Sequence, residues 1–269
     1  MGLFDFLKKK KETENDFVTC TSTSVNKEDI VTQAANLEKT NYESSQGLTI
    51  NLSKHTENLN TVLVDLSKNL SVDLSKHTAR VAMAIDYSGS MDGLYNSGAV
   101  QKIITRLLPI ALKFDDNGEL ESWIFSNSKE KLDAVTIHNY KDYVKKNIRK
   151  ASMSMGGTNY APVLKDIIKL YKDKEPSTTP AFVLFITDGD NWDTSDTERV
   201  IRELSDYNMF IQFVGIGNES FNFLRKLDNL SGISHDNTGF ISVKDMNKLS
   251  DEELYTKLLK QYRDWLNNK

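Results

Sequence analysis

The feature that most constrains the fold of this chain is a pair of nearly unbroken apolar segments in its second half, residues 182–186 and 210–216. A strand with one face in water would alternate apolar and polar residues, so these segments predict strands that are buried on both faces. Such strands are typical of parallel sheets covered by helices. Each is followed by a helical pattern, at 194–207 and at 221–230, so we expect strands and helices to alternate here.

The same alternation begins near Arg80. A buried strand is predicted over residues 81–85, and the apolar residues after it recur at helical spacing over 100–112. The remaining predicted elements are strands at 120–125, 134–138 and 240–243 and helices at 160–171 and 251–266. We expect the second of these strands to be an antiparallel edge, because it follows a turn. The sequence therefore predicts an α/β fold class: a doubly wound, Rossmann-like, mostly parallel sheet with helices on both faces.

The chain ahead of this domain divides into two segments of different composition. Residues 1–46 are rich in Lys, Glu, Asn, Ser and Thr, and their few apolar positions predict a flexible polar tail and linker. Residues 47–78 hold an internal repeat, in which the sequence of 48–56 recurs closely at 70–78. Both copies alternate apolar and polar residues, so we expect a segment of short β-strands ahead of a main domain at 79–269.

The composition excludes several classes of protein. With 34 basic and 38 acidic residues the chain has a formal net charge of -4, so it lacks the basic field that favours nucleic-acid binding. A single cysteine, Cys20, cannot form a disulfide within the chain, which favours a reducing, cytoplasmic location. No apolar run approaches the ~20 residues that span a bilayer. Apolar residues 3–7 beside the lysines at 8–11 could contact an anionic membrane, but a frayed tail is the preferred interpretation.

Oxygen-bearing side chains follow predicted strands or precede a helix at three places. Asp86, Ser88 and Ser90 form a D-x-S-x-S loop directly after the first strand. Thr158 ends a Gly-Gly-Thr sequence before a helix, and Asp188 lies in a Thr-Asp-Gly sequence after a later strand. Because ligands of open parallel sheets bind beyond the carboxyl ends of the strands, we expect these side chains to meet at one edge. Two carboxylates and three hydroxyls suit the hard cations Mg²⁺ or Mn²⁺, whereas a softer metal would need Cys or His.

These three motifs, in this order, resemble the metal-ion-dependent adhesion site (MIDAS) of the von Willebrand factor A domain. The resemblance implies that Ser88 and Ser90 bind the metal directly. It implies that Asp86, Thr158 and Asp188 bind it directly or through water, so that the motif is complete. One coordination position is then left for an acidic side chain of a protein partner.

Residues 81–101 carry a more particular resemblance. Their D-x-S-G-S-M sequence, followed by a tyrosine and a helix, is most similar to the bacterial A-domain proteins of tellurium-resistance and stress-response clusters. This resemblance implies a bacterial protein that binds a partner in tellurite resistance or another stress response. The side chains expected around the open coordination position, as contacts for that partner, are Tyr87, Met91, Asn159, Tyr160 and Trp192.

An enzyme is the alternative interpretation. Asp86 could be the nucleophile of a metal-dependent phosphohydrolase, but the haloacid-dehalogenase type of that chemistry uses a second Asp two residues later, where this chain has Ser88. A serine hydrolase is also disfavoured, because no glycine stands two residues before Ser88 as a nucleophile elbow requires. We therefore expect a binding protein and not an enzyme. In a third interpretation the motif residues bind no metal and only cap turns. A direct titration with Mg²⁺ would distinguish this interpretation from metal binding.

Overall fold

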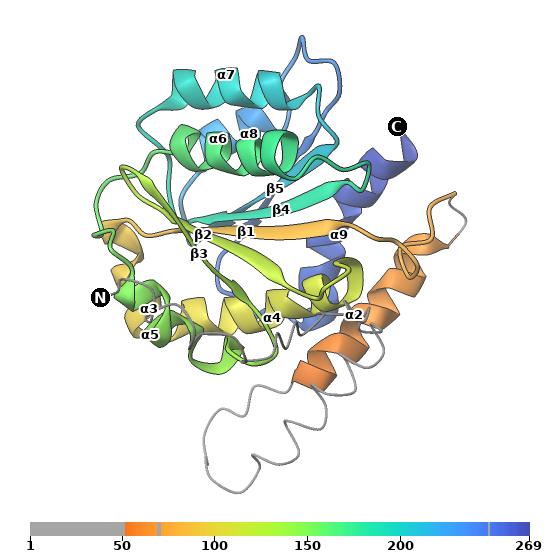
Figure 1. The fold of residues 1–269 in the computed structure, drawn as a ribbon, viewed down its shortest axis with the longest axis horizontal. Helices are drawn as coiled ribbons and strands as arrows, with labels where there is room; N and C mark the ends of the chain where they lie inside the picture. Colours follow the sequence, from red (N-terminus) through yellow and green to blue (C-terminus); the bar gives the residue numbers. More distant parts are fainter. Residues whose placement is uncertain (1–51, 69–70, 247) are drawn as a thin grey trace, which may run out of the picture.

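A six-stranded sheet forms the centre of the computed structural model, which describes residues 52–68, 71–246 and 248–269 (Figure 1). The strands are β1 (Arg80–Asp86), β2 (Leu120–Phe125), β3 (Lys129–Val135), β4 (Ala181–Thr187), β5 (Met209–Ile216) and β6 (Thr238–Val243). Their order in the sheet is β3-β2-β1-β4-β5-β6, and neighbours are parallel except for β2 and β3. The predicted mostly parallel, doubly wound sheet is confirmed.

Helices cover both faces of the sheet (Figure 1). On one face lie α6 (Ala161–Lys169), α7 (Thr194–Leu204) and α8 (Asn222–Leu227). On the other face lie α2 (Leu52–Ser67), α4 (Ala99–Phe114) and α9 (Asp251–Asn267). Shorter helical segments are α3 (Asp92–Asn96), α5 (Tyr143–Lys146), the 3₁₀ turns Gly89–Met91, Tyr140–Asp142 and Ile148–Lys150, and a π-helical extension of α6, Leu170–Lys174.

The central strands supply an apolar core on each face. Every residue of β4 and β5 is buried. Beneath α6, the rings of Phe185 and Phe213 pack with their centroids 5.1 Å apart. On the opposite face, Phe182 and Phe210 pack against Tyr262 of α9. Because successive side chains of a strand point to opposite faces, an unbroken apolar strand serves both cores at once.

The strands predicted for the repeat at 47–78 are wrong where the structure describes it. Helix α2 occupies Leu52–Ser67 of this segment, and no strand forms between Ser71 and Ala79. The alternating apolar residues of the middle of the repeat lie in α2, whose buried positions recur at helical spacing. They are Leu52, Thr56, Leu59, Val62, Leu63 and Leu66. The short β-type pattern is therefore part of a longer amphipathic helix.

The two copies of the repeat also differ in conformation. The sequence Leu-Ser-Lys-His-Thr is helical at 52–56 and irregular at 74–78. The leucine is buried in both copies, so packing on the rest of the domain selects the local structure. The tail at 1–46, with Cys20, lies outside the described residues, as do Leu48, Ile50 and Leu70 of the predicted strands.

Strand β3 begins earlier than predicted. It starts at Lys129, although the predicted antiparallel edge is confirmed by its pairing with β2. Only Val135 among its seven residues is buried, and Leu132 is partly buried. The sequence of this strand therefore has little apolar pattern from which to predict its bounds. Its position is defined by its hydrogen bonds with β2.

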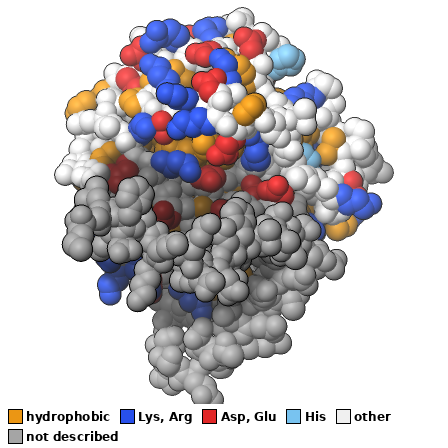
Figure 2. Space-filling model, viewed as in Figure 1, with side chains coloured by type: hydrophobic (Ala, Val, Ile, Leu, Met, Phe, Trp, Pro, Cys, Tyr) orange, Lys and Arg blue, Asp and Glu red, His pale blue; other side chains and the backbone are white. Residues whose placement is uncertain are grey.

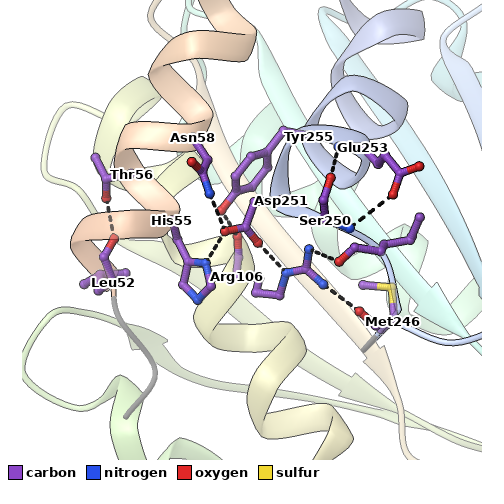
Figure 3. A network of polar contacts seen from close by, with 11 residues as sticks. Leu52, His55, Thr56, Asn58, Arg106, Met246, Ser250, Asp251, Glu253 and Tyr255 are labelled. Carbon is purple, nitrogen blue, oxygen red and sulfur yellow. Dashed lines mark hydrogen bonds and ion pairs between the residues drawn. The ribbon is translucent and has the colours of Figure 1, made fainter. Parts of the chain in front are cut away.

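A buried ion pair joins the three helices of one face (Figure 3). The Arg106 Nε of α4 donates to Asp251 Oδ1 of α9 at 2.8 Å. Asp251 Oδ2 lies 2.5 Å from His55 Nδ1 and accepts a hydrogen bond from Asn58 Nδ2 at 3.0 Å, and both of these side chains belong to α2. The Arg106 guanidinium also donates to two backbone carbonyls that precede α9. The network therefore fixes α2 to α4 and α9.

The surface over α6 and α7 carries charges of both signs. Figure 2 shows Lys and Arg side chains beside Asp and Glu side chains there. Glu198 of α7 pairs with Arg202 at 2.8 Å and with Lys226 at 2.6 Å. This face therefore presents mixed charge.

Among the described helices, none is both long enough and apolar enough to cross a membrane.

Candidate metal centre

The two predicted carboxylate ligands lie where the strand order reverses. Asp86 ends β1, and Asp188 directly follows the last residue of β4. These strands are parallel neighbours, with Ile85 paired to Ile186, so their carboxyl ends reach the same edge of the sheet. From β1 the sheet continues to β2 on one side and to β4 on the other. Doubly wound sheets bind their ligands at this switch point.

Oxygen atoms of three predicted ligands have the spacing of a small cation's coordination sphere. The hydroxyl oxygens of Ser88 and Ser90 are 3.0 Å apart, and the Ser90 hydroxyl donates to Asp188 Oδ1 at 2.8 Å. Neighbouring ligands of an octahedral ion with metal–oxygen bonds of ~2.1 Å are about 3 Å apart. Within the described residues, no three His, Cys, Asp or Glu side chains gather where they could hold a metal. A metal centre here would therefore depend on the hydroxyls, and this donor set fits Mg²⁺ or Mn²⁺.

The loop that carries Thr158 contacts the loops after both strands. Gly156 forms a β-bridge with Ser88, and the Gly89 backbone N donates to the Gly156 carbonyl at 3.0 Å. The Trp192 backbone N donates to the Thr158 carbonyl at 2.9 Å. The structure therefore places Thr158, a buried residue, between the two other motifs.

Asp86 is a buried carboxylate that hydrogen bonds hold in place. The Ser88 backbone N donates to its Oδ1 at 2.8 Å, and the Thr187 hydroxyl donates to its Oδ2 at 2.6 Å. Burial raises the pKa of Asp86 to about 6, although these hydrogen bonds oppose the change. Burial also raises the pKa of Asp188, opposed by the hydrogen bond from Ser90. A cation that neutralises both carboxylates would offset the cost of burying them.

Three residues that position the site were not predicted from the sequence. Thr187 donates to Asp86, as described above. The carboxylate of Asp193 accepts hydrogen bonds from two backbone N–H groups at the start of α6, at 2.9 and 2.8 Å, which fixes the segment after Thr158. Asn127 Oδ1 accepts a hydrogen bond from the Gly157 backbone N at 2.8 Å. Asp is a common N-cap residue, but Asp193 caps a helix about thirty residues earlier in the chain, a pairing that sequence spacing does not reveal.

The predicted partner contacts differ widely in exposure. Met91 and Tyr160 are fully buried, so the prediction that their side chains contact a partner is wrong. Met91 ends a short 3₁₀ turn and packs into the core, and the Tyr160 hydroxyl donates to the Thr187 hydroxyl at 3.2 Å. Tyr87 is almost completely buried, whereas Asn159 is half-buried. Trp192 is 79% exposed, and it is the side chain of this set that a partner could contact most extensively.

Two sequence comparisons match most of this chain. The family model described as "vWA found in TerF C terminus" matches residues 78–269. The uncharacterized protein YcbR of Bacillus subtilis (strain 168) is 40% identical over 190 residues, which cover 70% of this chain and 77% of that protein.

Solved structures share the fold. Proximal thread matrix protein 1 from the mussel byssus, with a zinc-occupied MIDAS motif, matches 70% of this chain with a TM-score of 0.51 at 17% identity. The match covers 46% of that protein, so this chain spans about half of its length. Manganese-loaded TRAP of Plasmodium vivax matches 70% of this chain and 74% of its own, with a TM-score of 0.49 at 16% identity. Because the family model covers most of the chain, the protein belongs to the von Willebrand factor A family, of the type found at the C-terminus of TerF.

Proposed function

We propose that this protein binds Mg²⁺ or Mn²⁺ and uses the ion to capture an acidic side chain of a protein partner. The proposed ligands are Asp86, Ser88, Ser90, Thr158 and Asp188. The observation that carries the proposal is the spacing of the Ser88, Ser90 and Asp188 oxygens at the switch point of the sheet. Domains of this family are generally interaction modules, and the zinc in the MIDAS motif of the mussel protein supports a divalent ion here.

The charge of the donor set explains why such an ion would attract an acidic group. Two carboxylates cancel the charge of a divalent cation, and the hydroxyls add none, so the ion stays electrophilic enough to take a third carboxylate. Ser90 is exposed and Asp188 is half-buried, so this side of the site faces solvent. The partner's Asp or Glu would bind there. Trp192, Asn159 and the small exposed part of Tyr87 would surround it.

The family assignment supports a finer part of the proposal. We propose a role in bacterial tellurite resistance or another stress response, which the TerF type of domain supports, and a cytoplasmic location, which the single cysteine favours. We propose no catalytic step. The alternative, a phosphohydrolase with Asp86 as nucleophile, would be supported if the wild type, but not Asp86→Asn, hydrolysed p-nitrophenyl phosphate with Mg²⁺.

Calorimetric titration with Mg²⁺ and Mn²⁺ tests the metal site. The wild type should bind one ion, and Asp86→Ala should bind none, because one carboxylate supplies too little charge for a cation that dehydrates reluctantly. Asp92→Ala is the matched control, since Asp92 lies close by but pairs with Arg149 at 3.2 Å. At a concentration of 100 times Kd the ion should stabilise the wild type by about 2.7 kcal/mol and leave Asp86→Ala unchanged. Equal binding by both variants would overturn the assigned ligands.

Capture from a lysate of the native bacterium tests the second part. A partner that depends on this site should be retained with Mg²⁺, released by a chelator and absent with Asp86→Ala. Retention that persists unchanged in the presence of the chelator would show that the partner uses another surface. The proposal that the ion captures the partner would then be wrong, even if the protein binds the ion.

A further inference from the structure

Tyr95 is a buried side chain that reaches the backbone of the first proposed metal ligand. It belongs to α3, the short helix that follows the D-x-S-x-S loop, and it is 4% exposed. Its hydroxyl donates to the backbone carbonyl of Asp86 at 2.9 Å. The carboxylate of Asp86 is held by separate hydrogen bonds, from the Ser88 backbone and from Thr187. Tyr95 therefore fixes the backbone from which this carboxylate extends.

The ring of Tyr95 also supports the residue between the first two motif residues. Tyr87 lies between Asp86 and Ser88, and its ring meets that of Tyr95 edge to face, with the ring centroids 5.3 Å apart. Both side chains are buried, and aromatic pairs of this geometry stabilise beyond the apolar area that they bury. The start of the loop is therefore held through the backbone of Asp86 and through the side chain of Tyr87.

Arg149 holds Tyr95 from a distant part of the chain. Its guanidinium carbon lies 5.2 Å from the centre of the Tyr95 ring, and its Nη2 donates to Asn96 Oδ1 at 2.7 Å. The ion pair of Arg149 with Asp92 joins the same helix, but the Asp92 side chain is 49% exposed, so this pair should contribute little. Arg149 is therefore attached to α3 mainly through the Tyr95 ring and Asn96.

The segment that carries Arg149 leads to the loop of another proposed ligand. Arg149 lies in a 3₁₀ turn ahead of Gly156, which forms a β-bridge with Ser88. Its Nη1 also donates to Met155 Sδ at 3.9 Å. Arg149 therefore links α3, which follows the two serines of the motif, to the segment that precedes Thr158.

We infer that Tyr95 is a positioning residue of the proposed metal site, and that Arg149 acts through it. Neither belongs to the five proposed ligands. A loop that is already held in place loses less conformational freedom when it binds an ion, so the ion binds more tightly. Residues that orient metal ligands from outside the coordination sphere typically change metal affinity by about 10- to 100-fold when they are mutated. The inference rests on the proposed function and adds to it two residues that determine the affinity for the ion.

Tyr95→Phe tests the inference by calorimetric titration of the full chain with Mg²⁺. Phenylalanine keeps the ring against Tyr87 and Arg149 and removes the hydroxyl, so one hydrogen bond is lost. The Kd for Mg²⁺ should rise about tenfold, the lower end of the usual range, because the lost bond is to the backbone of Asp86 and not to its carboxylate. The Tm of the metal-free protein should fall by about 2–4 °C, as expected for one buried hydrogen bond.

Tyr255→Phe is the matched control. Tyr255 is fully buried in α9, and its hydroxyl donates to the backbone carbonyl of Arg106 in α4 at 2.8 Å (Figure 3). The control therefore loses a hydrogen bond of the same kind and of nearly the same length, between helices that carry none of the proposed ligands. Its Tm should fall by a similar amount, whereas its Kd for Mg²⁺ should equal that of the wild type.

Arg149→Ala tests the second part of the inference. The change removes the contact with the Tyr95 ring and the bond to Asn96, and it should raise the Kd for Mg²⁺ about threefold, as expected for a cation on an aromatic ring. If Arg149 acts through Tyr95, the double variant with Tyr95→Phe should bind Mg²⁺ no more weakly than Tyr95→Phe alone. The control is Arg202→Ala, which removes another surface ion pair, with Glu198, and should leave the Kd unchanged.

The outcomes distinguish this inference from the proposed function. An unchanged Kd in Tyr95→Phe, or an equal rise in Tyr255→Phe, would overturn the role of Tyr95 and leave metal binding standing. If Tyr95→Phe does not fold, Arg149→Ala decides, because its side chain is partly exposed, and an unchanged Kd would then overturn the inference. A double variant that binds threefold more weakly than Tyr95→Phe would show that Arg149 does not act through Tyr95. Absence of Mg²⁺ binding by the wild type would overturn the proposed function, and this inference with it.

Discussion

The substitution Asp251→Asn tests whether the buried ion pair between α4, α9 and α2 stabilises the fold. Asp251 is 9% exposed and faces Arg106, His55 and Asn58. Burial alone would raise its pKa, but the hydrogen bonds from His55 and Asn58 and the charges around it lower the pKa from 3.8 to about 2. Asparagine has the same shape and keeps an oxygen for Arg106, but its amide nitrogen replaces Oδ2 and cannot accept from Asn58 Nδ2, so the change removes the charge and that hydrogen bond.

The lowered pKa sets the expected magnitude. A carboxylate whose pKa falls from 3.8 in the unfolded chain to about 2 in the folded one stabilises the fold by about 2 kcal/mol at pH 7. This stability is fully present above pH ~4 and is lost as the pH falls towards 2, with about half remaining at pH 3. For a domain of this size, about 2 kcal/mol corresponds to a decrease in Tm of roughly 4–8 °C.

Thermal unfolding followed by circular dichroism at pH 7 and at pH 3 measures the effect. The control is Asp264→Asn, the same substitution in the same helix, at a side chain that is 48% exposed and whose ion pair should contribute about 1 kcal/mol or less. If Asp251→Asn lowers the Tm at pH 7 no more than this control does, the network does not stabilise the fold. A deficit of the same size at pH 3 would show that its origin is not the charge of Asp251.

Two further substitutions test the packing and capping of the same helices. Leu59→Ala should lower the free energy of unfolding by about 2–5 kcal/mol in a urea titration, because Leu59 is a fully buried residue of α2. Val64→Ala on the exposed side of α2 is its control, and similar small losses in both variants would mean that α2 is not part of the core. Ser250→Ala should cost about 1 kcal/mol, because Ser250 and Glu253 form a capping box at the start of α9. An unchanged urea midpoint would contradict that contribution.

The sequence predicted the elements whose signal is local. The bounds of β4, β5 and α4 were predicted to within a few residues. A strand buried on both faces has a continuous apolar sequence, and a helix buried along one stripe has apolar residues at helical spacing, so both are recognised from the sequence alone. The start of β3 was predicted too late because Val135 is the one fully buried residue of this strand. The strand prediction for the repeat was wrong because Leu-Ser-Lys-His-Thr adopts two conformations, and its first copy lies in a helix that packs against α4 and α9. The division into segments 1–46, 47–78 and 79–269 stays a prediction.

The proposed site was partly predictable for a similar reason. Asp86 and Asp188 follow apolar strands, so their meeting at one edge follows from a parallel sheet. Which neighbours are exposed does not follow from the sequence: Met91 and Trp192 both flank motif residues, yet one is buried and the other is not. The capping of α6 by Asp193 depends on two loops that only the folded sheet brings together.

The antiparallel edge strand β3 has a consequence for the association of this protein with itself. An edge strand offers unpaired backbone groups to which a strand of another molecule could add, and lysines and bulges are the usual means of preventing it. β3 carries Lys129 and Lys131, which pair with Asp166 and Glu121, and its register with β2 shifts between Leu120 and Ser122. A second molecule that added a strand here would have to bring its own chain past these charges along an irregular ladder. These features therefore disfavour polymerisation by strand addition at β3, which a regular, apolar edge strand would promote.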